Sequence, residues 1–249
     1  MFDIKNQTAI QAMREGGAIL AKIVQALITE VTAGMTTMDI NLRAEVLMAQ
    51  NNVMPSFKGY KGFPGVVCTS INDEIVHAIP GKRVLENGDL LKIDCGVIHR
   101  GYHTDHAVAV IVGGKGDQKA ERFMKTIERA MYKGIDQVRP GAKTGDIGFA
   151  VQSEVEGGGY SIVRDFIGHG IGRNLHESPE ILNIGKKGQG YALIPGMTIC
   201  IEPICAMGER FCITKSDDWT AVTRDGSLAC QFEHTILITE TGYEILTKV

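Results

Sequence analysis

The chain carries one pattern twice, and this repeat constrains its fold more than any other feature. VTAGMTTMDI at residues 31–40 and VRPGAKTGDI at residues 138–147 share valine, glycine, threonine, aspartate and isoleucine in register. Self-similarity at a fixed separation indicates that one supersecondary unit has been used twice. We therefore expect two related halves, about 1–115 and 116–249, that together build a single domain.

Each copy of the repeat is preceded and followed by a segment of helical character. Apolar residues fall three and four positions apart over 10–28 and again over 120–138, which is the spacing of one buried helix face. After each copy, Thr37 or Thr144 offers a hydroxyl that can cap the N-terminus of the next helix. Each half is thus expected to begin as helix, turn and helix.

Strands are expected after the helices of each half. Five segments are rich in Val, Ile and Leu and are bounded by Gly, Pro, Asn or Asp, namely 66–70, 90–95, 103–112, 198–204 and 229–239. Helices followed by runs of strands favour an α+β architecture, with an antiparallel sheet covered by helices.

Composition restricts the compartment and the partners. The formal charge of -3 over 249 residues gives no positive field for nucleic acid or for an anionic membrane surface. The first residues, MFDIKNQTAI, lack the pattern of a secretory signal, and no stretch stays apolar long enough to span a bilayer. The six cysteines form no CxxC pair and lie in apolar segments, so we expect them to be reduced. These features predict a soluble, cytoplasmic protein.

Two aspartates stand inside a predicted hairpin. In LLKIDCGVIHRGYHTDHAVAV, apolar runs flank a polar turn near His99, Arg100 and Gly101. A hairpin tip between His99 and Arg100 places Asp94 opposite Asp105 on one sheet face, with Cβ atoms about 5 Å apart. Facing carboxylates in an apolar setting repel each other and lose hydration, so they need a cation or a shared proton. A metal is the simpler remedy, and the alternative is that one of the two is solvated at an edge or caps a turn.

Two glutamates and a histidine extend this set. Glu202 interrupts MTICIEPIC and Glu233 interrupts CQFEHTILIT, where a buried charge is costly unless it is paired. His169 stands in IGHGIGRNLHE, where flanking glycines remove side-chain bulk. Each residue alone also fits a buried salt bridge or a hydrogen-bonded histidine. With Asp94 and Asp105 they form an oxygen-rich set that suits Mn, Fe(II), Co or Zn. Such a set can hold two ions about 3.5 to 4 Å apart that activate water for hydrolysis.

The order of these motifs resembles the pita-bread metallopeptidases, and most closely the type I methionine aminopeptidases. Asp94 and Asp105 are followed by GHGIGR and HE, then by IEP and then by EHT, and the likeness covers nearly the whole chain. It implies a pita-bread fold of two pseudo-symmetric halves. It also implies an enzyme that hydrolyses the initiator methionine from nascent polypeptides with a small second residue. Glu202 and Glu233 stand too close together for the helical insertion that type II members carry.

The resemblance also assigns roles to the acids. It implies that Asp94 chelates one metal ion, that Asp105 and Glu233 bridge both ions, and that His169 and Glu202 complete the other. Glu202 is further expected to accept and shuttle the proton of the attacking water.

The resemblance extends to the substrate. His176 matches the family histidine that binds the substrate carbonyl oxygen, and His77 matches the one that contacts the scissile peptide. The methionine side chain would enter an apolar pocket of aromatic rings and sulfur, which suits an unbranched thioether. By alignment the lining is Phe57, Tyr60, Phe63, Cys68, Leu175 and Trp219. Phe57, Phe63 and Leu175 depart from the commonest bacterial pattern, which leaves the shape of the pocket open.

His106 is a further departure, because relatives usually carry a small or hydroxyl residue directly after the first bridging aspartate. It is either an additional donor near the metal ligands or a residue that faces away from them. The alternation of side chains along a strand favours the second interpretation.

Two other functions stay open from the sequence. An X-Pro peptidase would keep the chemistry with a different substrate, and a pita-bread binding module would keep the fold without catalysis. The short segment before Asp94 and the pocket residues disfavour the first, and the complete ligand set disfavours the second. We expect a monomer that meets nascent polypeptide N-termini and makes transient ribosome contact, with no nucleic-acid readout and no membrane association.

Overall fold

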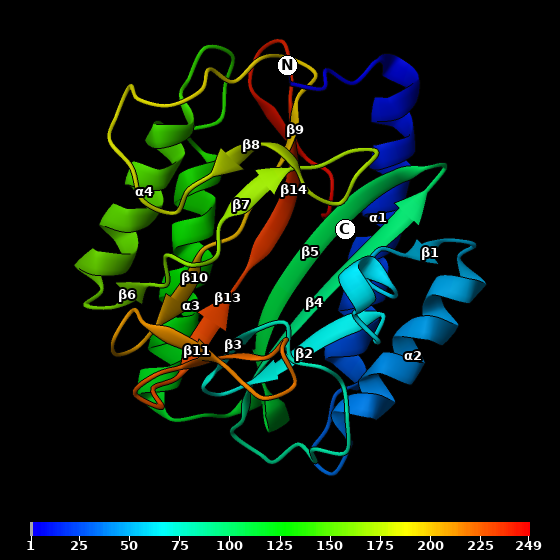
Figure 1. Cartoon of the computed structure of the whole chain (residues 1–249), viewed down its shortest axis with the longest axis vertical. Coiled ribbons are helices and arrows are strands. Elements are labelled where there is room, and N and C mark those ends of the chain that lie inside the picture. The colour runs from blue at the N-terminus through cyan, green and yellow to red at the C-terminus, as the bar shows by residue number, and fades with distance from the viewer. Residues whose placement is uncertain (1) are drawn as a thin grey trace.

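The helices repeat in pairs along the chain, as the sequence predicted (Figure 1). The computed structural model describes residues 2–249. In this part, α1 (Gln7–Glu30) precedes α2 (Thr37–Gln50), and α3 (Gln118–Ile135) precedes α4 (Thr144–Gly157). Short 3-10 turns, η1 (Tyr60–Gly62) and η2 (Val112–Gly114), complete the helical elements. None of these helices is both long and apolar enough to cross a membrane.

Local hydrogen bonds decide where the helices begin. α1 starts after Asn6, whose side-chain oxygen accepts a hydrogen bond from the Ala9 N–H at 3.0 Å. α2 starts after Thr36, whose hydroxyl accepts from the Asp39 N–H at 3.2 Å while the Asp39 carboxylate accepts from the Thr36 N–H at 2.7 Å. The predicted cap at Thr37 is therefore wrong by one residue.

The same shift occurs at α4. Thr144 lies inside the helix, and its hydroxyl accepts from the Tyr191 N–H at 3.2 Å. The preceding residue, Lys143, donates its backbone N–H to the Asp146 carboxylate at 2.8 Å. In both halves the aspartate of the repeat satisfies the first exposed donor of the helix.

The two copies of the repeat are held in the same way. Gly34 donates its N–H to the Leu85 carbonyl, and Gly141 donates its N–H to the Leu193 carbonyl, each at 2.9 Å. Both glycines adopt positive φ, 93° and 81°, a region that suits a residue without Cβ. Each copy also forms one isolated β-bridge, Thr36–Val84 in the first and Lys143–Ala192 in the second. The sequence repeat therefore corresponds to a repeated structural unit.

A nine-stranded antiparallel sheet joins the halves, in the order β1-β4-β5-β14-β9-β7-β8, with β2 beside β4 and β15 beside β14. α1 packs on β4 and β5, and α3 packs on β5, β9 and β13, so that helices cover one face of the sheet (Figure 1). The strands are β1 (Met54–Pro55), β2 (Val67–Ile71), β4 (Leu90–His99), β5 (Tyr102–Ile111), β7 (Gly168–Gly170), β8 (Glu177–Ile181), β9 (Thr198–Ile201), β14 (Glu233–Ile238) and β15 (Tyr243–Ile245).

Two smaller sheets flank the large one. One has the order β13-β10-β6 and the other β11-β12-β3. Their strands are β3 (Glu74–Val76), β6 (Ser161–Ile162), β10 (Ile204–Ala206), β11 (Cys212–Thr214), β12 (Ala221–Thr223) and β13 (Ala229–Gln231).

Two segments that we predicted as single strands change sheet part-way. The segment 198–204 divides at Glu202 and Pro203 into β9 and β10, and 229–239 divides at Phe232 into β13 and β14. Proline lacks the N–H that a strand ladder needs, which explains the first break. Each break lies beside one of the two predicted glutamate ligands. The fold is the α+β arrangement expected from the sequence, while the boundary near residue 115 between the halves stays a prediction.

Candidate metal centre and active site

Asp94 and Asp105 come from the β4–β5 hairpin, but they are not directly opposite each other. The register pairs Asp94 with Ala107 and Asp105 with Gly96, so the aspartates are diagonal neighbours on one sheet face. The predicted hairpin tip was wrong because the turn consists of Arg100 and Gly101, with φ of 49° and 78°. Positive φ at both positions is the geometry of a type I′ turn, for which the glycine is suited.

Glu202 and Glu233 reach the same place from the two strand breaks. Glu202 follows β9, and Glu233 begins β14 directly across from Ala107 of β5. A side chain at a break is released from the alternation of one sheet and can point into the space between two sheets. The structure thus brings both glutamates beside the hairpin aspartates.

His169 is presented by β7, and its flanking glycines serve close backbone packing. A Cβ at Gly168 would lie 2.3 Å from the Cys200 carbonyl oxygen, and one at Gly170 would lie 2.4 Å from that of Ser178. The glycines therefore let β9 and β8 approach, whereas the sequence suggested that they leave room for a ligand. The His169 Nδ1–H donates to the Gly170 carbonyl at 2.9 Å, which leaves the Nε2 lone pair free to bind a metal.

The acids are buried without enough partners. Asp94 Oδ1 and Glu233 Oε1 are fully buried and accept no hydrogen bond from residues 2–249. No lysine or arginine in that range forms an ion pair with any of the four acids. His169 Nε2 lies 3.5 Å from Glu202 Oε1, but a neutral imidazole does not compensate the charge. Unpaired buried carboxylates are costly, so this site requires cations or bound protons.

Burial perturbs every ionisable group of this cluster. It raises the pKa of Asp94 to about 7 and raises the pKa of Asp105 well above its usual range, with Glu233 adding to the rise at Asp105. The pKa values of Glu202 and Glu233 are likewise raised well above normal, first by burial and then by the neighbouring carboxylates. Burial lowers the pKa of His169 to about 3, so its imidazole is neutral at pH 7.

The geometry fits metal ions. One ligand oxygen each of Asp94, Asp105 and Glu233 lies within 4.8 Å of the other two, and a second such group consists of His169, Cys200 and Glu233. Oxygen and imidazole ligands suit divalent ions such as Mn, Fe, Co and Zn. The residues of this chain therefore fit the binding of divalent cations.

The sequence did not indicate Cys200 as a neighbour of the cluster. It sits on β9 across from Thr235 of β14, with its Sγ 3.7 Å from the Thr235 hydroxyl. Burial first, and Glu233 next, raise the pKa of this thiol well above its usual range. Cys200 does not line the cavity that holds the acids, so it packs behind them.

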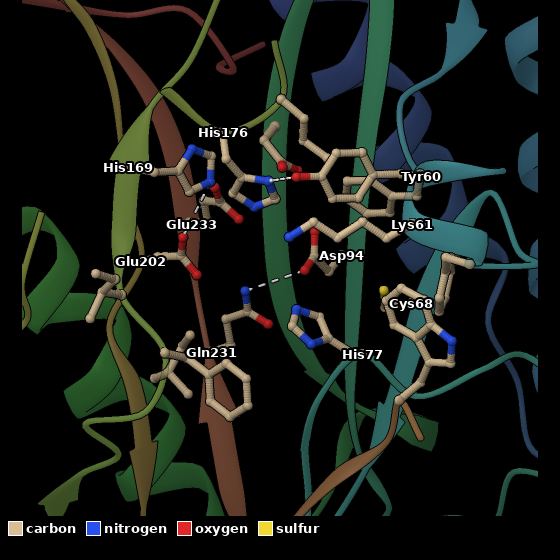
Figure 2. A pocket seen from close by; sticks show the side chains of 18 of the residues that line it. Tyr60, Lys61, Cys68, His77, Asp94, His169, His176, Glu202, Gln231 and Glu233 are labelled. Carbon is tan, nitrogen blue, oxygen red and sulfur yellow. Dashed lines mark hydrogen bonds and ion pairs between the residues drawn. The ribbon is translucent and has the colours of Figure 1, made fainter. Parts of the chain in front are cut away.

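One cavity of about 340 Å³ contains all of the predicted site residues (Figure 2). The predicted residues that line it are Phe57, Tyr60, Phe63, Cys68, His77, Asp94, Asp105, His169, Leu175, His176, Glu202, Trp219 and Glu233. The acids form one end, and the aromatic and sulfur side chains form a wall in which Phe63 and Trp219 pack edge to face at 5.1 Å between centroids.

Two histidines lie between the acids and the apolar wall. The Tyr60 hydroxyl and His176 Nδ1 are 2.8 Å apart, and the ring centroids of His176 and His169 are 4.3 Å apart. Burial lowers the pKa of His176, and it lowers the pKa of His77 to about 4. Both imidazoles are therefore neutral at pH 7, and each can offer one N–H to a polar substrate atom.

Sequence reasoning missed three further polar groups in the cavity, and one of them is Asp165, an exposed residue. Gln231 donates its side-chain N–H to Asp94 Oδ2 at 3.4 Å, and Lys61 lines the cavity from the η1 turn. Gln231 and Glu233 stand two positions apart in CQFEHTILIT, so strand alternation puts them on the same face, and this spacing was the available indication. No sequence feature indicated Lys61, because a lysine in a glycine-rich loop is usually exposed to solvent.

His106 lies behind the metal ligands rather than among them. Its ring stacks on that of His234, with centroids 4.6 Å apart and an angle of 8° between the planes. Its Nδ1–H donates to the Glu233 carbonyl, and it does not line the cavity. The expected alternation of strand side chains accounts for this placement.

Comparison with known proteins agrees with this geometry. The model of metallopeptidase family M24 matches residues 11–240. The chain belongs to this family. Among M24 members, it is 43% identical over 248 residues to the methionine aminopeptidase of Clostridium acetobutylicum, covering 99% of each chain. It is 41% identical over 249 residues to methionine aminopeptidase 1 of Bacillus subtilis, covering 100% of each.

A solved M24 structure matches equally well. The methionine aminopeptidase of Thermotoga maritima superposes with a TM-score of 0.98 at 39% sequence identity, and the match covers 100% of both chains. The M24 membership and the pita-bread fold expected from the motif order are therefore confirmed. A metallopeptidase needs a divalent metal, and the buried acid cluster is where this chain can hold one.

Proposed function

We propose that this chain removes the initiator methionine from polypeptides whose second residue is small. The observation that carries this proposal is the single cavity in which buried acids at one end meet an apolar, sulfur-containing wall at the other. The acids would hold the metal ions that peptide hydrolysis requires, and the wall suits an unbranched thioether side chain. The full-length likeness to methionine aminopeptidases supports the same substrate.

We assign two metal ions to the five ligands. Asp94 would hold one ion, Asp105 and Glu233 would contribute to both, and His169 with Glu202 would complete the other. When bound, the ions supply a nucleophilic water at neutral pH and polarise the scissile carbonyl. The oxygen-rich ligand set favours Mn, Fe(II), Co or Zn.

The side chains around this set move protons and orient the substrate. Glu202 takes the proton that the attacking water loses and passes it to the leaving amine, a task that suits a carboxylate with a raised pKa. His176 donates an N–H to the carbonyl oxygen as negative charge develops there. His77 contacts the scissile peptide, and its low pKa keeps it neutral near pH 7.

The remaining expectations belong to the same proposal. The enzyme works in the cytoplasm as a monomer on nascent polypeptide N-termini, and it touches the ribosome transiently. The formal charge of -3 disfavours readout of nucleic acid and binding to an anionic membrane surface.

A peptide panel tests the proposal against the two alternatives. Methionine release from Met-Ala-Ser is expected with added Mn or Co and is expected to stop with a chelator, whereas Ala-Pro-Ala stays intact. Cleavage of Ala-Pro-Ala alone would favour an X-Pro peptidase, and no cleavage of either peptide with metal present would favour a binding module. Replacing alanine by leucine in the second position tests the preference for small residues.

A further inference from the structure

Lys61 is a cation at the rim of an otherwise acidic cavity. It sits in the η1 turn between Tyr60 and Gly62, with its own φ at 47° and that of Gly62 at 91°. Left-handed backbone at a residue with a Cβ is strained and persists only where its surroundings hold it. The turn is closed by the Gly59 N–H, which donates to the Phe63 carbonyl at 2.8 Å. This turn fixes where the lysine side chain starts.

No carboxylate in residues 2–249 lies within 4.0 Å of the Lys61 ammonium, in contrast to Lys58, which pairs with Glu45 at 2.5 Å. The Lys61 ammonium lies 5.4 Å from the centre of the Tyr60 ring. Figure 2 shows it reaching into the space between His176 and His77. Its positive charge contributes to the low pKa of both histidines.

The cavity thus has buried acids at one end, while the exposed charged residues of its lining are the cation Lys61 and the carboxylate Asp165. Under the proposed function the first residue and the scissile peptide lie beside the metal-binding acids, so the later residues of the substrate extend toward the rim. In an extended peptide the side chains of the first and third residues point to the same side. Tyr60 and Phe63 of the methionine wall belong to the segment that carries Lys61. The third residue of the substrate therefore faces this segment.

Resting on the proposed function, we infer that Lys61 is a specificity-determining residue that binds an acidic side chain at the third position of the substrate. The second position cannot supply this carboxylate, because the proposed activity requires a small residue there. Lys61 acts through its charge, and it takes no part in bond cleavage.

The experiment compares three amidated peptides, Met-Ala-Asp-Ser, Met-Ala-Asn-Ser and Met-Ala-Lys-Ser, with kcat/KM for methionine release as the readout. Amidation removes the C-terminal carboxylate, which would otherwise compete for Lys61. The wild-type enzyme is expected to prefer Asp over Asn by about three- to five-fold, as for an exposed ion pair. The preference is expected to shrink when salt rises from about 0.05 to about 0.5 M.

Variants separate the charge of Lys61 from its shape. Lys61→Met is expected to bring the Asp-to-Asn ratio close to one, Lys61→Arg to keep it, and Lys61→Glu to favour the peptide with lysine. Lys58→Met is the matched control, since Lys58 is already paired with Glu45, and it is expected to keep the wild-type ratio. Circular dichroism confirms that each variant is folded.

The outcomes distinguish a failure of this inference from a failure of the proposed function. Equal kcat/KM for the three peptides, or a preference that survives Lys61→Met, overturns the inference and leaves methionine release intact. Failure of the metal-loaded enzyme to release methionine from any of the peptides overturns both.

Discussion

Asp105 and His106 are neighbours on β5, and Glu233 and His234 are neighbours on β14, yet within each pair the side chains lie on opposite faces of the central sheet. On the helix side both histidines find partners within the described residues, although the buried Thr104 hydroxyl on the same face has none. The His106 Nδ1–H bonds to the Glu233 carbonyl, and His234 Nδ1 lies 2.9 Å from the Thr247 hydroxyl. On the cavity side, buried oxygens of Asp94 and Glu233 have no partner in residues 2–249.

The histidines on the helix face are held by the chain itself, whereas the carboxylates on the cavity face need an external group. Substitutions on the helix face should change stability, because they remove contacts that the folded chain already makes. Substitutions on the cavity face should change metal binding and catalysis, because the buried carboxylates there repel one another in the absence of cations. The following predictions test this division.

The largest effect is expected from Glu202→Gln on the cavity face. The amide cannot take up a proton, so kcat for methionine release should fall about 10²- to 10⁴-fold, as for the loss of a general base. The matched control is Glu180→Gln. Glu180 is exposed, and its backbone lies directly across from His169 in the register of β7 and β8. Full activity in Glu202→Gln, measured at equal bound metal, would remove Glu202 from the proton transfer.

Next in size is the pH dependence of metal binding. In the metal-free protein the raised pKa of Asp94, about 7, means that this group stabilises the fold at low pH and that its contribution is lost as pH rises from about 4 through 7. A metal ion replaces the proton, so the increase in Tm caused by Mn should grow between about pH 5.5 and 7.5. Comparing Tm with and without Mn at each pH cancels the contribution that histidines away from the site make to Tm. A Tm increase that is constant with pH would contradict proton displacement.

His106→Ala tests the helix face. The variant removes the hydrogen bond to the Glu233 carbonyl and the stack on His234, so the free energy of unfolding should fall by about 1 to 3 kcal/mol. Asp105→Asn is the opposite case: it should weaken metal binding and stabilise the metal-free protein, because it removes a buried carboxylate. Urea unfolding and calorimetric metal titration measure both quantities. If the free energy of unfolding changes by the same amount and with the same sign in both variants, the proposed difference between the two faces is wrong.

The smallest effect is expected for Tyr60→Phe, which removes the 2.8 Å contact with His176 Nδ1. A hydroxyl that donates to Nδ1 keeps the proton on Nε2, so its loss should lower kcat/KM by about three- to ten-fold. Tyr132→Phe is the matched control on the helix face, where the Tyr132 hydroxyl lies 3.3 Å from His234 Nε2. If both variants lose activity equally, the tyrosine does not position His176 in particular.

Much of this arrangement follows from local patterns in the sequence. The repeat, the two long helices and the acidic interruptions of apolar strands were visible because periodicity and buried charge are properties of short segments. The departures came from tertiary context. The hairpin register depended on a turn at Arg100 and Gly101, and Pro203 divided a predicted strand between two sheets.

Residues that gain their meaning only from the assembled cavity could not be predicted. From the sequence, Cys200 resembled an ordinary core cysteine, and only the pairing of β9 with β14 places it beside the acids. Lys61 resembled a solvated loop residue, and only the folded structure shows that it lines the cavity. The roles assigned to the individual ligands rest on the family resemblance and on the geometry, and the variants above test them.

The pairing of β5 with β14 bears on how the chain could be cut into two fragments. β14 pairs with β5 through Glu233–Ala107 and His234–His106, so Asp105 and Glu233, the two acids that we propose to bind both ions, stand on opposite strands of this ladder. A cut in the connection after η2 would leave Asp94 and Asp105 on one fragment and the other three ligands on the second. Neither fragment alone would contain a complete set, and activity would report their reassembly, as in a two-component complementation assay.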